Sequence, residues 1–247
     1  MIPPDDGAKP LYHFKAAEGQ VYPVGVVIPD ELIAALRRLN REHGGYLYQK
    51  EPQAAVLADR PPTENLGREQ LERLCAQVLS IARKHQLNRL ALANAVLAFV
   101  QTEIPYGFDQ DTTAVFEGGP FDEYGRMPPE SLHDSVGDCE CTSLLCASLL
   151  AYLGFEVALL SVVVNPGNHM AVGLLPDSVL LPGWSAEGLG IVEAKDSEGK
   201  RYLYGETALE GCNLPFGAIP ADWRDGLKVE KVTAIGLPRS ATQRAEA

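Results

Sequence analysis

The segment from Ser143 to Tyr152 most constrains the fold, because its dense apolar pattern is that of a buried helix. A helix that is apolar on all sides must be enclosed by other elements. Gly154 gives this helix a natural end, and the sequence after it is typical of strands. We expect four strands: Glu156 to Val164, His169 to Leu175, Arg201 to Thr207 and Leu227 to Ile235. One buried helix followed by several strands predicts an α+β fold.

Upstream of this helix, the sequence predicts an N-terminal extension and then a helical pair. Val21 to Ile28 is rich in β-branched residues and precedes a helical spacing from Glu31 to Leu39. Glycine, proline and charged residues mix from Glu42 to Glu64, which favours a surface connection. From Arg68 to Gln101 apolar residues recur at helical intervals, with a break near residues 86–88. We therefore divide the chain into a strand-helix extension with its linker (1–65), a core (66–236) and a disordered tail (237–247).

Composition and charge narrow the class of protein and its partners. The 247 residues are 46% hydrophobic and 22% charged, which is ordinary for a globular protein. A formal net charge of −12 disfavours nucleic acid and anionic membranes as partners. The acidic, proline-rich start of the chain does not resemble a signal peptide, and its apolar runs fall short of the roughly 18 residues of a transmembrane helix. Five cysteines suit free thiols better than a disulfide framework, so we expect a cytoplasmic protein.

Cys139 is the candidate nucleophile because it lies at the start of the buried helix. Asp138 is a good N-cap residue, which places Cys139 in the first helical turn. The helix dipole and the unpaired N–H groups there favour a thiolate. The carboxylates of Asp138 and Glu140 oppose it, because like charges repel. A histidine is therefore needed to hold the thiolate as an ion pair.

His169 is the candidate for that histidine, because it opens an expected strand directly after a tight turn. Its second ring nitrogen needs an acceptor that fixes the tautomer, and we choose Glu206 at the end of the next expected strand. Asp177 and Glu193 are alternative acceptors, and His133 is a minor alternative base. The remaining histidines lie in polar or linker-like sequence: His13, His43 and His85.

These segments together resemble a known family. Gly137-Asp138-Cys139, the helix up to Gly154-Phe155, Val157 to Val164, Asn168 to Gly173 and Lys200 to Thr207 follow in this order. In that order they resemble the transglutaminase-like superfamily of cysteine enzymes, especially its prokaryotic members. The segments Val100-Gln101, Ile104-Pro105-Tyr106 and Asp109 resemble the part that precedes the cysteine, and Gly217 to Pro220 resembles the family weakly. The resemblance covers roughly residues 90–220 and leaves the N-terminal third outside.

The resemblance implies a papain-like α+β core in which the nucleophile helix packs on an antiparallel sheet. It implies Cys139 as the nucleophile, His169 as the general acid and base, and Glu206 in the place where the family usually has an aspartate. Two positions depart from the family: Cys141 stands where many relatives carry an acidic residue, and Glu206 is one methylene longer than aspartate. We expect no cofactor and no metal.

The function that we expect is a cysteine-dependent hydrolase acting on a peptide or amide bond. Cys139 attacks the carbonyl, His169 protonates the departing amine, and the resulting thioester passes to water. The backbone N–H of Cys139 and the hydroxyl of Tyr106 are the expected donors to the oxyanion. The expected partner is a peptide, a protein or a small amide substrate, with no nucleic acid and no membrane. The oligomeric state is left open.

Three alternatives remain open at this point. An amine acceptor in place of water would make the protein a transamidase. A zinc site in a loop would use Cys139, Cys141 and His133. A non-catalytic binding module would keep the same fold without activity. In any of these, the glycine-containing insertion from Pro176 to Lys200 is expected to form a lid over the cleft.

Overall fold

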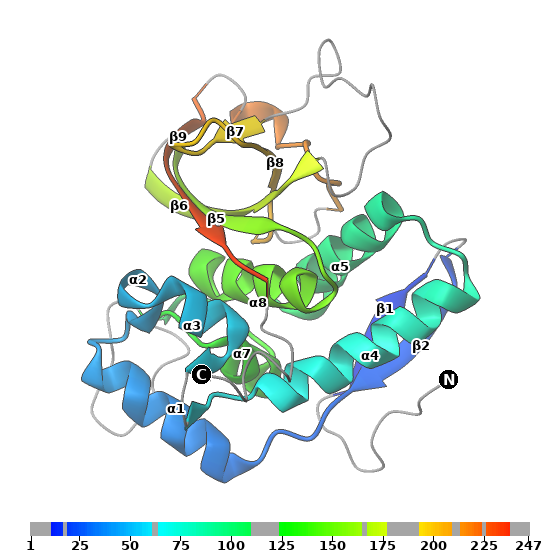
Figure 1. Cartoon of the computed structure of the whole chain (residues 1–247), viewed down its shortest axis with the longest axis vertical. Coiled ribbons are helices and arrows are strands. Elements are labelled where there is room, and N and C mark those ends of the chain that lie inside the picture. The colour runs from blue at the N-terminus through cyan, green and yellow to red at the C-terminus, as the bar shows by residue number, and fades with distance from the viewer. Residues whose placement is uncertain are drawn as a thin grey trace.

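The helix α8 (Cys139–Tyr152) lies in the middle of the molecule, between a curled sheet and a group of helices (Figure 1). The computed structural model describes residues 11–16, 19–60, 64–109, 124–164, 167–176, 193–208, 213–223 and 226–237. Every residue of α8 from Cys141 to Ala151 is buried, which confirms the prediction of an enclosed helix. Asp138 is its N-cap and Cys139 is its first residue, as expected.

The sheet has five strands in the order β7-β8-β6-β5-β9, and all neighbours are antiparallel. The strands are β5 (Val157–Val164), β6 (Gly167–Leu174), β7 (Glu193–Lys195), β8 (Arg201–Gly205) and β9 (Lys228–Ile235). Four of them were predicted. The three-residue β7 was not, because it is too short to show a pattern of alternation.

Both faces of the central strand β5 are buried, which explains its continuous apolar sequence. Val157 and Leu159 belong to the main hydrophobic cluster that surrounds α8. Ala158, Leu160 and Val162 point to the other face and form a second cluster with residues of β6, β7 and β8. The sheet is curled, as Figure 1 shows, and this second cluster lies on the face of β5 opposite to the main cluster. The protein is therefore an α+β fold, with a buried helix packed on one face of a curled antiparallel sheet.

The predicted helical pair is confirmed as α4 (Arg68–Lys84) and α5 (Arg89–Glu103). Asn88 ends the break between them, because its side-chain oxygen accepts a hydrogen bond from the backbone N–H of Ala91 at 2.8 Å and so caps α5. One further helix, α7 (Pro128–Asp134), was not predicted. Proline is tolerated in the first turn of a helix, so Pro128-Pro129 begins α7 and does not break it.

The N-terminal part begins with a hairpin of β1 (Leu11–Lys15) and β2 (Val21–Gly25), followed by α1 (Asp30–Glu42). The strand and the helix predicted here are confirmed. The expected surface connection from Glu42 to Glu64 is wrong, because this stretch contains α2 (Leu47–Lys50) and α3 (Pro52–Leu57) with their apolar side chains buried. A helix of one turn cannot show a hydrophobic period, so no pattern indicated α2. The remaining short elements are β3 (Asp59–Arg60), β4 (Glu64–Asn65) and the 3₁₀ turn Ala221–Trp223.

The main hydrophobic cluster is shared between the N-terminal part and the rest of the chain. Tyr12 and Phe14 of β1 and Val56 of α3 belong to the same cluster as α4, α5 and α8. The Tyr12 hydroxyl also donates a hydrogen bond to the backbone oxygen of Leu132 in α7. The division into an extension and a core stays a prediction. The tail beyond residue 237 and most of the expected lid, residues 177–192, lie outside the described residues.

Candidate active site

Cys139 is held at the start of α8 by a tight turn. The Asp138 carboxylate accepts a hydrogen bond from the backbone N–H of Cys141 at 3.2 Å, which caps the helix. A Cβ atom at Gly137 would lie 2.5 Å from the Cβ of Cys141, so only glycine allows this close approach. The side chain of Cys139 is largely buried, with the residue 9% exposed.

The Cys139 thiol is a hydrogen-bond donor in this structure. Its Sγ donates a hydrogen bond to Oε2 of Glu140 at 2.9 Å. Burial, followed by the charges of Glu140 and Asp138, raises the pKa of the Cys139 thiol far above its usual range. The backbone N–H of Met170 acts in the opposite direction, because it donates a hydrogen bond that favours the thiolate. The carboxylates thus outweigh the helix dipole, and the thiol needs a base to lose its proton.

His169 and Glu206 form a hydrogen-bonded pair. Nε2 of His169 lies 3.0 Å from each carboxylate oxygen of Glu206. Glu206 is fully buried and also accepts hydrogen bonds from the Tyr204 hydroxyl at 2.6 Å and from the backbone N–H of Ala208 at 2.9 Å. Burial opposes ionisation, but these donors and His169 outweigh it, so the pKa of Glu206 lies below its usual range. Since Glu206 is an acceptor, Nε2 carries the proton and Nδ1 is left as the basic nitrogen.

Three separate elements bring these residues together. Met170 follows His169 on β6, and its backbone oxygen accepts a hydrogen bond from Ser143 of α8 at 3.1 Å. The hydroxyl of Thr207, the residue after Glu206, lies 3.0 Å from the hydroxyls of both Thr142 and Ser143. The first turn of α8, the start of β6 and the end of β8 therefore meet at one place, where the amide of Met170 faces the Cys139 sulfur.

Trp223 adds a contact that the sequence did not indicate. Its ring packs against the ring of His169 in a T-shaped arrangement, with centroids 5.1 Å apart and an interplanar angle of 73°. Trp223 lies on a single 3₁₀ turn, where no periodicity connects it to the strand of His169. The residue that it packs on is the candidate base.

Tyr106, the expected oxyanion donor, lies next to the turn that precedes Cys139. It forms an isolated bridge with Gly137, and its ring packs edge-to-face on Phe108. Burial raises the pKa of the Tyr106 hydroxyl, so the hydroxyl stays protonated and able to donate. The residue is 36% exposed, and its hydroxyl makes no hydrogen bond within the described part of the chain.

The alternative site residues are placed elsewhere. Glu193 lies on β7, where it pairs with Arg201 at 3.3 Å. His133 lies on α7, with Nδ1 2.9 Å from the carboxylate of its neighbour Asp134. Cys139 and Cys141 are both helical, so the loop that a zinc site with His133 would need is not present. Asp177 lies outside the described residues.

One other cluster of possible metal ligands occurs in the described residues: Asp109, Asp138 and Cys141, with ligand atoms within 4.8 Å of one another. The buried Arg126 already binds two members of this cluster. Its guanidinium donates a hydrogen bond to Asp109 at 3.1 Å, and its backbone N–H donates one to the sulfur of Cys141 at 3.2 Å. Burial, followed in each case by the charge of a neighbouring carboxylate, raises the pKa of Asp109 and of Asp138 to about 6. The guanidinium thus takes the place that a cation would need, and we regard the cluster as structural.

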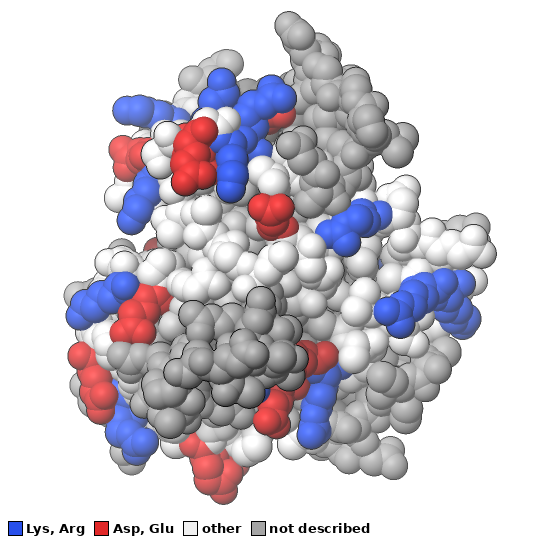
Figure 2. Space-filling model, in the orientation of Figure 1, with Lys and Arg blue, Asp and Glu red and all other residues white. Residues whose placement is uncertain are grey.

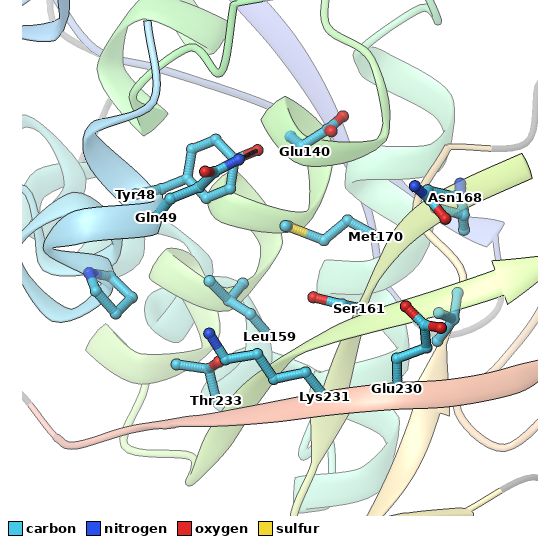
Figure 3. A pocket seen from close by; sticks show the side chains of 13 residues that line it. Tyr48, Gln49, Glu140, Leu159, Ser161, Asn168, Met170, Glu230, Lys231 and Thr233 are labelled. Carbon is cyan, nitrogen blue, oxygen red and sulfur yellow. Dashed lines mark hydrogen bonds between the residues drawn. The ribbon is translucent and has the colours of Figure 1, made fainter. Parts of the chain in front are cut away.

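A pocket of about 460 Å³ opens beside His169 (Figure 3). Leu159 and Ser161 of β5 and Met170 of β6 lie in its middle, and Glu230, Lys231 and Thr233 of β9 follow its lower side. Tyr48 and Gln49 of α2 lie on the opposite side, next to Glu140 at the start of α8. The residues from α2 come from the segment that was expected to be a connection, so sequence reasoning missed them.

The surface of the molecule carries charges of both signs. On the face drawn in Figure 2, Lys and Arg side chains gather over the curled sheet with acidic side chains between them, and the middle of the molecule is largely uncharged. No helix among the described residues is both long enough and apolar enough to cross a membrane.

Comparison with the models of known protein families, with curated proteins and with solved structures finds no match to this chain. The functional argument therefore depends on the site itself.

Proposed function

We propose that this protein is a cysteine-dependent hydrolase that cleaves a peptide or amide bond through a thioester. Cys139 is the nucleophile, His169 is the general base and then the general acid, and Glu206 orients the imidazole. The observation that carries this proposal is the paired geometry of His169 and Glu206, with Nε2 3.0 Å from both carboxylate oxygens, next to the Met170 amide that faces the sulfur of Cys139.

The chemistry follows from the protonation states. The thiol proton passes to Nδ1 of His169 as the sulfur attacks the carbonyl carbon, and the buried Glu206 stabilises the imidazolium that forms. The imidazolium then gives this proton to the departing amine, which leaves a thioester on Cys139. Water, deprotonated by His169, hydrolyses the thioester and regenerates the thiol. The N–H of Cys139 and the Tyr106 hydroxyl are the proposed donors to the oxyanion.

We also propose that the α+β fold is a papain-like core of the transglutaminase-like kind. The order of the elements supports it: a buried helix beginning with the cysteine, then a strand with the histidine near its start, then a strand ending before the acid. The proposed compartment is the cytoplasm. The cysteines among the described residues, Cys75, Cys139, Cys141 and Cys146, are free thiols, which suits a reducing compartment. We propose water as the acceptor of the acyl group, since the proposed site includes no channel for an amine.

The test is the reactivity of Cys139 as a function of pH. Each cysteine is alkylated briefly with iodoacetamide and mapped by mass spectrometry in the wild type, in His169→Ala and in the control His133→Ala. We expect Cys139 to react at least about tenfold faster than the fully buried Cys75 at neutral pH, and His169→Ala alone to remove the difference. Equal labelling of Cys139 and Cys75 in all three proteins would exclude Cys139 as the nucleophile.

The acyl-enzyme gives a second measurement. Incubation with a mixture of peptide amides, followed by hydroxylamine, should release hydroxamates from the wild type. The Cys139→Ser variant should release none, because an ester resists this reagent far better than a thioester. A peptide mass addition at Cys139, removed by hydroxylamine, identifies the thioester directly.

A further inference from the structure

Glu140 faces both the nucleophile and the pocket. Its carboxylate accepts the hydrogen bond of the Cys139 thiol at 2.9 Å, and its side chain lines the pocket that opens beside His169. No cation pairs with Glu140 in the part of the chain that the structure describes. A carboxylate beside a proposed nucleophile would hinder the reaction unless something neutralises it, because a negative neighbour disfavours the thiolate.

The resting hydrogen bond directs the thiol proton toward Glu140 and not toward His169. Burial, followed by the charge of Glu140, is what raises the pKa of the Cys139 thiol. The other ionisable groups around the sulfur are Asp138 at the helix start, Tyr48 of α2, Tyr106 and Tyr204 of β8. Burial first of all raises the pKa of each of these tyrosines, so they stay neutral. Asp138 is committed to capping the helix, which leaves Glu140 as the carboxylate able to move.

The pocket has the chemistry to receive a long cationic side chain. Leu159 and Met170 give it an apolar middle, which suits an aliphatic stem (Figure 3). Its charged lining residues are the carboxylates of Glu140 and Glu230 against the single ammonium of Lys231. Glu230 and Lys231 form no ion pair with any residue that the structure describes, so both are available to a ligand. Gln49, Ser161 and Asn168 offer further polar groups.

We propose that this pocket binds a lysine or arginine side chain of the substrate, and that pairing of this cation with Glu140 releases the Cys139 thiol to His169. The inference rests on the proposed function. The S–H bond then breaks toward Nδ1 of His169, the electron pair stays on sulfur, and Glu140 remains ionised throughout. The enzyme is thus inactive toward neutral amides until a cationic substrate displaces Glu140, and α2 contributes to specificity through Tyr48 and Gln49.

Charged thiol reagents test the inference without a known substrate. The intact protein is treated with three methanethiosulfonates that carry a trimethylammonioethyl, a methyl or a sulfonatoethyl group, and the rate at Cys139 is followed by peptide mapping. Each rate is divided by the rate of the same reagent with free cysteine. The proteins are the wild type, Glu140→Gln, Glu230→Gln, and the control Glu198→Gln, which removes the same charge from an exposed turn with its side chain 75% exposed.

We expect the wild type and Glu198→Gln to prefer the cationic over the anionic reagent by at least about tenfold. Glu140→Gln should lose this preference and should react about tenfold faster with the neutral reagent, because one unit of pKa changes the thiolate fraction tenfold. Glu230→Gln should weaken the preference without speeding the neutral reaction.

Equal normalised rates for the three reagents in the wild type would overturn the inference, and so would a preference for the cationic reagent that is undiminished in Glu140→Gln. In either case, labelling of Cys139 that still depends on His169 would leave the proposed function standing. A Cys139 that reacts with no reagent would overturn both.

Discussion

The rings of Trp223 and His169 pack in a T-shaped arrangement with centroids 5.1 Å apart, so the candidate base is held between an aromatic ring and the carboxylate of Glu206. An imidazole that has to face a sulfur must be prevented from rotating about its side-chain bonds. Glu206 fixes one nitrogen, and Trp223 restricts the plane of the ring. The two contacts together leave Nδ1 in a defined direction.

Replacing Trp223 by alanine should therefore reduce reactivity without unfolding the protein. We expect Trp223→Ala to lower the His169-dependent alkylation rate of Cys139 about tenfold, whereas Trp223→Phe, which keeps an aromatic ring, should retain most of it. The loss of the aromatic contact should cost about 1 kcal/mol of unfolding free energy, measured by urea denaturation. A Trp223→Ala variant with an unchanged pH profile of alkylation would show that the ring serves packing only.

The carboxylate of Glu206 should matter more for rate than for stability. Glu206→Gln keeps the size of the side chain but loses the charge that stabilises the imidazolium, so we expect hydrolysis to fall by a factor of about 100 or more. Tyr204→Phe removes one donor to that carboxylate and should reduce the rate only a few-fold. The measurement is kcat/KM on a cationic peptide amide that the wild type cleaves. A Glu206→Gln variant within about twofold of the wild type would exclude the role assigned to this residue.

Asp138 gives a prediction about pH. Burial and the charge of Glu140 raise its pKa to about 6, so the folded protein binds this proton more tightly than the unfolded chain does. Its contribution to stability is therefore present below the ordinary pKa of about 4 and is lost as the pH rises through about 6. Asp138→Asn, which keeps a capping side chain, should gain stability relative to the wild type by about 1–3 kcal/mol between about pH 4 and pH 7.

The control for Asp138 is alanine. Asp138→Ala loses the cap as well as the charge, so it should be about 1 kcal/mol less stable than Asp138→Asn at every pH. Both variants remove a negative neighbour of Cys139 and should raise its alkylation rate. Urea denaturation at a series of pH values measures the free energy of unfolding of each variant. If the difference in this free energy between Asp138→Asn and the wild type does not change with pH, the predicted titration of Asp138 is contradicted.

Thr207 should link the stability of the site to its activity. Its hydroxyl bridges Thr142 and Ser143, and Glu206 directly precedes it. Thr207→Val removes both hydrogen bonds at nearly constant volume and should cost about 1–2 kcal/mol, while Thr207→Ser restores them and should recover most of that loss. Activity should fall in Thr207→Val because the backbone that carries Glu206 is no longer tied to α8. Unchanged activity together with reduced stability would limit Thr207 to a structural role.

Much of the fold was predictable because it depends on long, strongly patterned segments. The uniform burial of α8, the helical spacing of apolar residues in α4 and α5, and the continuous apolar run of β5 each impose one secondary structure over eight residues or more. The positions of Cys139 and His169 followed, since Cys139 opens α8 and His169 lies near the start of β6. The structure places Glu206 directly after β8 and in contact with His169, as the choice of that residue required.

What could not be predicted depends on short segments and on contacts across the chain. The hairpin strand β1 buries Tyr12 and Phe14 in alternation, but five residues are too few to separate that pattern from chance. The helix α2 has four residues, and Trp223 lies on a single turn, so neither carries a period. The hydrogen bond from Cys139 to Glu140 depends on a side-chain rotamer, and spacing gives no information about it.

The thiol of Cys75 in α4 donates a weak hydrogen bond to the backbone oxygen of Leu149 in α8 at 3.6 Å, and both Cys75 and Cys146 are buried. A reagent reaches either sulfur only when the surrounding helices separate. The two residues are thus built-in reporters of local opening, one at the boundary between α4 and α8 and the other inside α8. Their labelling rates, compared with the rate of global unfolding, would measure how far the helix that begins with Cys139 loosens while the fold stays intact.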